Sequence, residues 1–206
     1  MTFATLGLDV SSVAIGVSVI DAQTKEILIK DVIELGGMEW HDRIPKTYEY
    51  FKNMLFMDIK IIQIYIEEPL TKTTDSYSAF HTSAVLQMWA GAVMGICTGI
   101  FGVIPRFINV RTARAFYKIP SAKSDTLTHQ KKEFEAKENV FKFLAESRGY
   151  ALTKELNRVG NVKPTTYDKT DALLIALAGS EGCESKEFVG VSKSEKDRKL
   201  AKKLRK

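Results

Sequence analysis

The residues Asp168-Lys169-Thr170-Asp171 stand directly before the apolar run Ala172-Leu173-Leu174-Ile175-Ala176-Leu177-Ala178. Because positions i and i+3 share one face of an α-helix, this stretch predicts a buried helix that carries two carboxylates at its beginning. Two carboxylates aimed at one point suit a hard divalent cation, which prefers oxygen ligands. A capping box between Thr165 and Asp168, which would satisfy free N–H groups at the helix start, is the alternative explanation for Asp168.

Two further candidate acids stand at the ends of apolar, strand-like runs. Asp9 follows a short run of β-favouring residues, and the pair Glu67 and Glu68 closes the run that begins at Ile61. Pro69 cannot donate to a strand ladder and favours an extended residue before it, so the strand is expected to end at the glutamates. Successive strand residues face opposite ways, so only one of the two glutamates is expected to belong to a site.

These acids are expected to meet at one edge of a sheet. The carboxyl ends of parallel strands lie at the same edge, and ligands bind there. The sequence therefore predicts a site formed by Asp9, Glu67, Asp168 and Asp171, although the four are far apart in the chain. For Asp9, a role in a turn is the alternative, because aspartate often bonds its own backbone two residues on.

The hydrophobic pattern along the rest of the chain predicts an α/β fold with a mixed sheet covered on both faces. Three strand patterns in an antiparallel meander come first, a helix with one apolar stripe follows, and strands and helices then alternate. The predicted strands cover residues 3–9, 14–20, 27–34, 61–68 and 103–110, and the predicted helices cover 42–56, 84–104, 133–147 and the stretch from 168. The stripe of the first helix consists of Ile44, Tyr48, Phe51 and Leu55.

The segment 84–104 contains no charged residue and is long enough to span a bilayer. Gln87 and Thr98 are polar, and Gly102 and Pro105 would interrupt the run. We therefore predict a buried crossover helix followed by a buried strand, and no membrane partner.

Gly91, Gly95 and Gly99 recur every four residues within this segment, a spacing that permits close backbone approach. Tight packing of the helix on the sheet is the favoured explanation, and contact with a second copy of the chain is the next.

Length and composition fit one enzyme domain with a tail. With 206 residues, of which 45% are hydrophobic, the chain can bury one sizeable core. We predict one folded domain over 1–182 and a basic tail over 183–206. The amino terminus lacks a basic region followed by an apolar stretch and a cleavage site, so a cytoplasmic location is predicted.

Motifs of other metal and nucleophile chemistries are absent from the sequence. His41, His81 and His129 are scattered, and no C-x-x-C or H-x-x-H spacing occurs. Cys97 and Cys183 suit a reducing compartment and structural roles. No serine-centred elbow and no Walker phosphate loop is present.

Basic charge is concentrated in the tail. Residues 186–206 contain nine Lys/Arg and three Asp/Glu, a net of +6, whereas the whole chain has 30 Lys/Arg and 25 Asp/Glu, a net of +5. The tail is either a contact for nucleic acid or a solvated chain end. Within the domain, a second set of basic residues interleaves with aromatic ones. It either faces DNA or belongs to one strand and helix with ordinary solvent-facing charges, and the members predicted to bind DNA are Arg111, Arg114, Lys118 and Lys123.

Three short motifs share their order and spacing with a known family. They are Leu6-Gly7-Leu8-Asp9 with Gly16 seven residues later, Ile66-Glu67 at a strand end, and Asp168-x-x-Asp171-Ala172-Leu173 at the start of the last core helix. Over residues 3–180 the chain resembles the RuvC-type Holliday-junction resolvases, of which phage and other viral genomes carry divergent versions. The resemblance implies a ribonuclease-H-like fold, a mixed five-stranded sheet with helices on both faces.

The same resemblance implies an activity. The substrate would be a four-way junction or other branched DNA, and the enzyme would be a homodimer, because a two-fold junction needs two symmetric active sites. Two Mg²⁺ or Mn²⁺ ions about 3.5 to 4 Å apart can activate a water and stabilise the transition state of phosphodiester hydrolysis. The family's metal-binding carboxylates fall on Asp9, Glu67, Asp168 and Asp171, and its basic residues near the scissile phosphate fall on Arg111 and Lys137.

The chain departs from the family pattern in three places. Val10-Ser11 stands where the family has Pro-Gly after its first aspartate, and Leu70 stands where it often has an aromatic wedge. Either the protein does not open the junction with a stacked side chain, or Tyr77 or Phe80 serves as the wedge in place of residue 70. The segment 119–136, rich in lysine and serine, is longer than the family's usual connection.

Other functions share parts of this pattern. A ribonuclease-H-fold nuclease acting on RNA:DNA hybrid or on flaps would have the same acids and a different binding surface. A sugar kinase or actin-like ATPase shares an opening such as Gly7-Leu8-Asp9-Val10-Ser11-Ser12, but it needs a second copy of the fold and another phosphate loop. A non-catalytic DNA-binding protein would have no use for four carboxylates.

Overall fold

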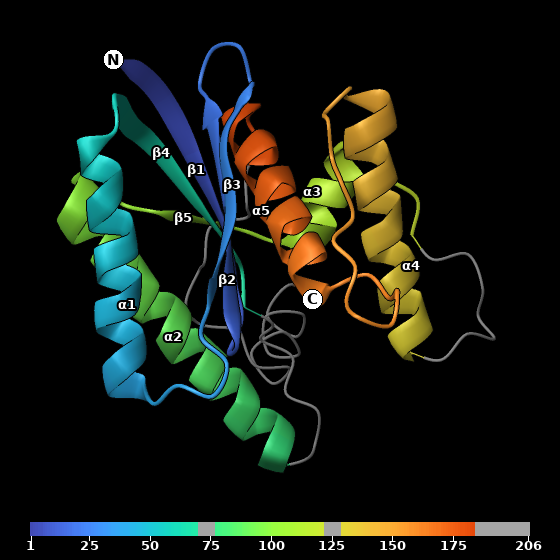
Figure 1. Ribbon diagram of the computed structural model, residues 1–206, viewed down its shortest axis with the longest axis horizontal. Helices are drawn as coiled ribbons and strands as arrows, with labels where there is room; N and C mark the ends of the chain where they lie inside the picture. Colours follow the sequence, from blue (N-terminus) through green and yellow to red (C-terminus); the bar gives the residue numbers. More distant parts are fainter. Residues whose placement is uncertain (70–76, 122–128, 184–206) are drawn as a thin grey trace, which may run out of the picture.

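The protein is built around a five-stranded mixed sheet (Figure 1). The structure, a computed structural model, describes residues 1–69, 77–121 and 129–183, and the side chains of all of these except 77–80, 129 and 130. β1, β2 and β3 form an antiparallel meander, whereas β4 runs parallel to β1 and β5 parallel to β4. The spatial order is β3-β2-β1-β4-β5, and the strands are β1 (Thr2–Val10), β2 (Ala14–Asp21), β3 (Ile27–Glu34), β4 (Ile59–Glu67) and β5 (Arg106–Ile108). The predicted fold class is confirmed.

Helices cover both faces of this sheet (Figure 1). α1 and α2 pack on one face and α5 on the other, and α3 and α4 pack against α5. A short 3-10 segment, η1 (Met54–Phe56), extends α1, and a π-helical segment, η2 (Phe143–Ser147), extends α4. The helices are α1 (Trp40–Asn53), α2 (Tyr77–Phe101), α3 (Val110–Phe116), α4 (His129–Lys142) and α5 (Pro164–Ser180).

The strand predicted over 103–110 is much shorter in the structure, where β5 has three residues. Gly102, with a φ of +67°, follows the end of α2, and Pro105 leaves no N–H for an earlier ladder bond. At the other end, the Asn109 side chain accepts a hydrogen bond from the Arg111 N–H and so begins α3. The end of α2 and the start of α3 therefore leave only Arg106–Ile108 of the predicted strand in the sheet.

Side chains alternate between the two faces along the central strands, as strand geometry requires. Leu6 and Leu8 of β1 lie in the core beneath α1 and α2. The residues between and after them, Gly7 and Asp9, face α5 instead. The same alternation in β4 places Ile66 on the α1–α2 side and Glu67 on the α5 side. The acids at the strand ends are therefore directed toward the helix with the two aspartates.

Two glycines allow α5 to approach the sheet closely. A Cβ added at Gly7 would stand 2.2 Å from the Ala172 carbonyl oxygen, and one at Gly16 would stand 2.1 Å from the Asp168 carbonyl oxygen. Both contacts are with backbone, which cannot swing away as a flexible side chain can. The Gly7 and Gly16 positions of the sequence motif thus set how near Asp168 comes to β1 and β2.

The predicted apolar stripe of α1 is wrong in part. Phe51 is buried, but Ile44 and Tyr48 are each 43% exposed, and Leu55, just beyond the helix in η1, is 53% exposed. The buried face of the helix follows Thr47 and Phe51 instead. The apolar stripe predicted from hydrophobicity alone therefore lies on a different side of α1 from the face that packs in the core.

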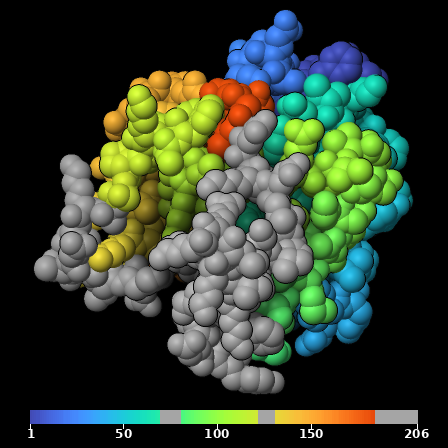
Figure 2. Space-filling view, turned by 180° about the vertical axis from the view of Figure 1, so that it is seen from behind, coloured from blue at the N-terminus to red at the C-terminus, as the bar shows by residue number. Residues whose placement is uncertain are grey.

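The predicted packing of the α2 glycines on the sheet is also wrong. A Cβ added at Gly91, Gly95 or Gly99 would meet no other atom of the described chain within 4 Å, so these glycines lie on the outward face. Between His81 and Phe101, α2 is long and apolar enough to cross a bilayer by length and composition, and 22% of that window is buried. Figure 2 shows α2 at the molecular surface beside α1. The absence of a membrane partner stays a prediction.

Candidate active site

Two adjacent parallel strands bring Asp9 and Glu67 together. Leu8 of β1 is the register partner of Ile66 of β4, so Asp9 and Glu67 follow side by side at the carboxyl ends of their strands. Asp9 itself lies in the ladder opposite Gly16. The turn that follows is formed by Ser11, whose side chain accepts from the Ala14 N–H and donates to the Ala14 carbonyl oxygen. The turn role considered for Asp9 is therefore taken by Ser11.

Helix α5 contributes the second pair of acids. It begins at Pro164, which needs no N–H partner at this position, and Lys163 precedes it without a side-chain cap. No capping box joins Thr165 to Asp168, because Asp168 lies in the second helical turn, past the free N–H groups. Asp168 is thus not part of a helix cap. Asp168 and Asp171 lie on the same face of α5, which faces β1.

The four carboxyl groups lie close enough to disfavour each other's ionisation. Burial, and next the Glu67 carboxylate, raises the pKa of Asp9 well above its usual range, with Asp171 and Asp168 adding to the shift. Burial raises the pKa of Glu67 and of Asp168, and Asp171 contributes in each case. Asp171 is 3% exposed, and burial likewise raises its pKa. Such a cluster is stable in its ionised form only next to compensating positive charge.

Two basic side chains from other helices lie at this cluster. Arg114 of α3 donates from Nη2 to Asp171 Oδ1 at 3.4 Å, and its charge lowers the pKa of Asp171 and Glu67 against the effect of burial. Lys137 of α4 is half-buried. Burial alone would lower the pKa of Lys137, but Asp171, Asp9 and Asp168 raise it. The acids thus favour the charged form of Lys137.

Arg111, which the sequence analysis placed near the scissile phosphate, has no contact with the acids in the described structure. Its side chain is exposed, and its backbone N–H serves the Asn109 cap. Arg114, three residues on and also among the residues predicted to bind DNA, is the arginine that lies beside Asp171. The hydrophobic pattern did not predict α3 as a separate helix, so it could not distinguish the position of Arg114 from that of Arg111.

Glu68 has a different environment from Glu67. Its Oε2 accepts a hydrogen bond from Asn109 Nδ2 at 3.1 Å, and its backbone N–H donates to the Ile108 carbonyl oxygen. These bonds direct Glu68 toward β5 and away from Asp9. The preference for Glu67 over Glu68 agrees with this geometry.

The donor set fits a hard divalent cation by its chemistry, because four carboxylates meet in a partly buried place where their charge is under-compensated. Among the described residues, however, no three His, Cys, Asp or Glu side chains already have the geometry of a finished metal site. Arg114 Nε is itself buried, with no hydrogen-bond partner in the described structure.

Other predicted residues lie elsewhere or outside the described structure. Lys118 is exposed after α3, with a φ of +55°. Lys123, Leu70 and residues 184–206 of the tail lie outside the described residues, and so do the side chains of Tyr77 and Phe80. Cys183, assigned to the tail, is 5% exposed and packs with the α5 core.

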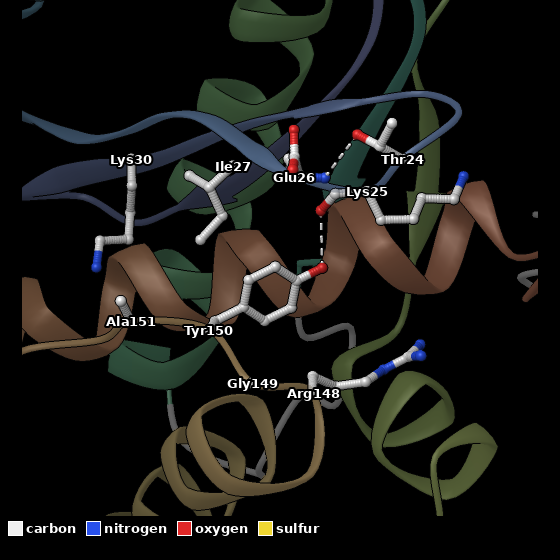
Figure 3. A pocket seen from close by; sticks show the side chains of 9 residues that line it. All are labelled: Thr24, Lys25, Glu26, Ile27, Lys30, Arg148, Gly149, Tyr150 and Ala151. Atoms are coloured by element: carbon white, nitrogen blue, oxygen red, sulfur yellow. Dashed lines mark hydrogen bonds between the residues drawn. The ribbon is translucent and has the colours of Figure 1, made fainter.

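A cavity of about 480 Å³ lies far from the acids. It is bounded by the β2–β3 turn at Thr24–Ile27 and by the segment Arg148–Ala151. This turn follows the end of β2 that pairs with Ala4, opposite the end that pairs with Asp9. Figure 3 shows the Lys25 and Arg148 side chains extending toward one side of the cavity and Lys30 at the other, and the Tyr150 hydroxyl donates to the Lys25 carbonyl oxygen at 2.8 Å. This hollow has no part in the site built from the acids.

Comparison with solved structures identifies the fold. Thermus thermophilus RuvC in complex with a Holliday junction substrate has a TM-score of 0.51 and 14% identity, over 88% of this chain and 97% of that one. Another Thermus thermophilus RuvC structure has a TM-score of 0.53 and 15% identity, over 87% and 97%. The protein therefore has a RuvC-like fold. No family profile and no curated protein matches the sequence.

Proposed function

We propose that this protein is a metal-dependent endonuclease of the RuvC type, which cleaves four-way junctions or other branched DNA by phosphodiester hydrolysis. The single observation that supports this most is the meeting of Asp9, Glu67, Asp168 and Asp171 at one sheet edge within a RuvC-like fold. Hydrolysis of a phosphodiester requires charge compensation around the phosphate, and an acid cluster that concentrates cations provides it.

The four acids would bind Mg²⁺ or Mn²⁺, which in this class of enzyme supplies an activated water and neutralises charge on the phosphate. The chain's own cations act beside them. Lys137, whose charged form the acids favour, and Arg114, which contacts Asp171, would bind the non-bridging oxygens of the scissile phosphate. The Arg114 contact with Asp171 would also orient that carboxylate before the substrate arrives.

Substrate preference separates this proposal from its alternatives. The test incubates the full chain with labelled four-way junction, duplex, flap and RNA:DNA hybrid, each with and without Mg²⁺. Paired nicks at symmetric positions of the junction support the resolvase. Preferential cutting of hybrid or flap would point to another ribonuclease-H-fold nuclease, and binding without cutting would point to a non-catalytic DNA-binding protein. A cytoplasmic location is part of the same proposal.

Substitution of Arg114 and substitution of Arg111 should have unequal effects on cleavage. We expect Arg114→Ala to lower single-turnover cleavage about 100-fold, because one charged donor at a transition-state oxygen contributes on that order. Arg111→Ala should change cleavage only a few-fold, because its exposed side chain does not contact the acids. Arg114→Lys should restore part of the rate. A larger loss in Arg111→Ala than in Arg114→Ala would return Arg111 to the catalytic role.

We also propose that the enzyme is a homodimer that uses the outward face of α2. Met88 on this face is 68% exposed, and the backbone is bare at Gly91, Gly95 and Gly99. Exposed apolar helix surface of this kind is typical of contacts between subunits, and small residues let two helices approach closely. A two-fold junction would then meet two symmetric sites.

Light scattering should therefore report twice the 23.1 kDa mass of the chain. Gly95→Leu should convert the dimer to a monomer without unfolding it, because the added side chain meets only open space in the single chain. Lys131→Leu, at an exposed helical position on α4, serves as the control and should leave the dimer intact. A Gly95→Leu protein that remains dimeric would show that the subunits meet elsewhere.

A further inference from the structure

The segment before α5 forms a small hairpin that the sequence analysis did not identify. Leu156 and Val162 pair in an antiparallel bridge, and the turn between them closes with a hydrogen bond from the Gly160 N–H to the Asn157 carbonyl oxygen at 3.0 Å. Asn157 Oδ1 accepts from the N–H groups of Val159 and Asn161. Gly160 has a φ of +80°, the left-handed conformation that a three-residue hairpin loop needs. The turn is thus held in one shape by its own bonds.

The hairpin is attached to the helix that presents two of the four acids. The Lys163 N–H donates to the Glu155 carbonyl oxygen at 2.7 Å, and the Glu155 N–H donates to Thr166 Oγ1 at 3.1 Å. Lys169 Nζ donates to Glu155 Oε1 at 2.5 Å. These three bonds fix the base of the hairpin to the first turns of α5. They therefore fix the position of the hairpin relative to Asp168.

Chain geometry limits how far the tip is from the acids. Five residue steps separate Val159 from Pro164, where α5 begins, and four helical steps, about one turn, separate Pro164 from Asp168. At the usual rise of each conformation, the tip lies within about 23 Å of Asp168. Successive base pairs of B-DNA are about 3.4 Å apart. A duplex arm that runs from the acids toward the hairpin would therefore reach it within about seven base pairs.

The surface of the hairpin combines positive charge with exposed apolar side chains. Arg158 and Lys163 are exposed, and neither side chain forms a salt bridge or hydrogen bond within the described chain. Val159 is 79% exposed and Leu156 is 56% exposed. From 156 to 163 the sequence contains no acidic residue. Glu155, which directly precedes Leu156, is paired with Lys169, although the charge of Lys163 also lowers its pKa.

We propose that this hairpin, Leu156–Val162 with Lys163 at its base, is a nucleic-acid contact that flanks the active site and acts at the branch point. Arg158 and Lys163 bind backbone phosphates, and Val159 and Leu156 press against bases that the branch leaves incompletely stacked. Small proteins of several folds insert apolar side chains into base steps in this way. The inference rests on the proposed function, because it takes branched DNA as the substrate.

The test of the phosphate contacts is a salt titration of junction binding. It uses an Asp9→Asn background so that the DNA is not cut. Arg158→Ala with Lys163→Ala should flatten the slope of log affinity against log salt by about 1.8, the value expected for two lost contacts with duplex DNA. Lys60→Ala is the matched control, because Lys60 is an exposed basic residue at the opposite end of the sheet. Equal slopes for the double variant and the control overturn the proposal.

The test of the apolar contact places 2-aminopurine at the branch point of the junction. Its fluorescence rises when the base unstacks, so the parent protein should produce a rise on binding. With Val159→Ser, most of that fluorescence rise should disappear while the salt slope of binding stays unchanged. With Val159→Leu, which keeps an apolar side chain, the rise should be as large as with the parent protein. A Val159→Ser protein that opens the junction as fully as the parent overturns the proposal. Thermal unfolding of each variant shows whether the fold is retained.

Cleavage of the same junction by the unaltered chain with Mg²⁺ separates failure of this inference from failure of the proposed function. If the unaltered chain cuts the junction and hairpin variants bind and open it normally, the hairpin inference is wrong and the nuclease stands. If the hairpin variants show the expected changes but the unaltered chain cuts nothing, the hairpin contact stands and the nuclease is wrong.

Discussion

Asp9→Asn and Asp171→Asn are each expected to abolish Mg²⁺-dependent cleavage of a four-way junction. A loss of about 10³-fold or more is expected, since removal of one ligand forfeits several kcal/mol of charge stabilisation at the phosphate. Both residues belong to the partly buried acid cluster, in which the carboxylates repel one another, and a divalent cation would relieve this repulsion. Single-turnover cleavage with excess enzyme measures the effect.

Binding of the junction should survive in both variants, because affinity for DNA comes mainly from basic contacts with phosphates. The control is Glu68→Gln. Glu68 neighbours Glu67 in sequence but accepts a hydrogen bond from Asn109, so its loss should change cleavage only a few-fold. Full activity in Glu67→Gln with loss in Glu68→Gln would show that the wrong face of β4 was chosen. Activity in Asp9→Asn comparable to that of the unaltered chain would remove the acid cluster from the mechanism.

The meeting of the acids was predictable because it depends on rules that act along the chain. An acid at the end of a strand points to one sheet edge, and strand alternation separates Glu67 from Glu68. The i, i+3 spacing of Asp168 and Asp171 fixes them on one helix face. These local rules, combined with one topology, were sufficient to place four residues that are up to 162 positions apart in the sequence.

The rest depended on contacts between elements that local pattern does not encode. Ile44 and Tyr48 of α1 have the spacing of a buried stripe, yet the helix packs through Thr47 and Phe51 because α2 lies beside it. Arg111 and Arg114 have the same residue type and nearly the same position. Only the docking of α3 against α5 decides that Arg114 meets Asp171.

The glycine that places α5 provides the second large expected effect. Gly16→Ala would put a Cβ 2.1 Å from the Asp168 carbonyl oxygen and 2.5 Å from its carbonyl carbon. Since both atoms belong to the helix backbone, the first turns of α5 must move away from β2. We expect a cost of about 3 kcal/mol in the free energy of unfolding, the upper part of the range for overpacked interiors. The melting temperature should fall by about 10 °C.

Cleavage should fall more than stability explains. At a temperature where Gly16→Ala is fully folded, we expect about a 100-fold loss in single-turnover rate, because displacement of a catalytic group by about 1 Å costs on that order. Gly36→Ala is the matched control, since its Cβ would have only the Val13 carbonyl oxygen at 3.9 Å as a neighbour. It should leave both quantities nearly unchanged. A Gly16→Ala protein with normal stability and cleavage would mean that α5 does not approach β2 this closely, and the geometry that joins Asp168 to Asp9 would then need another basis.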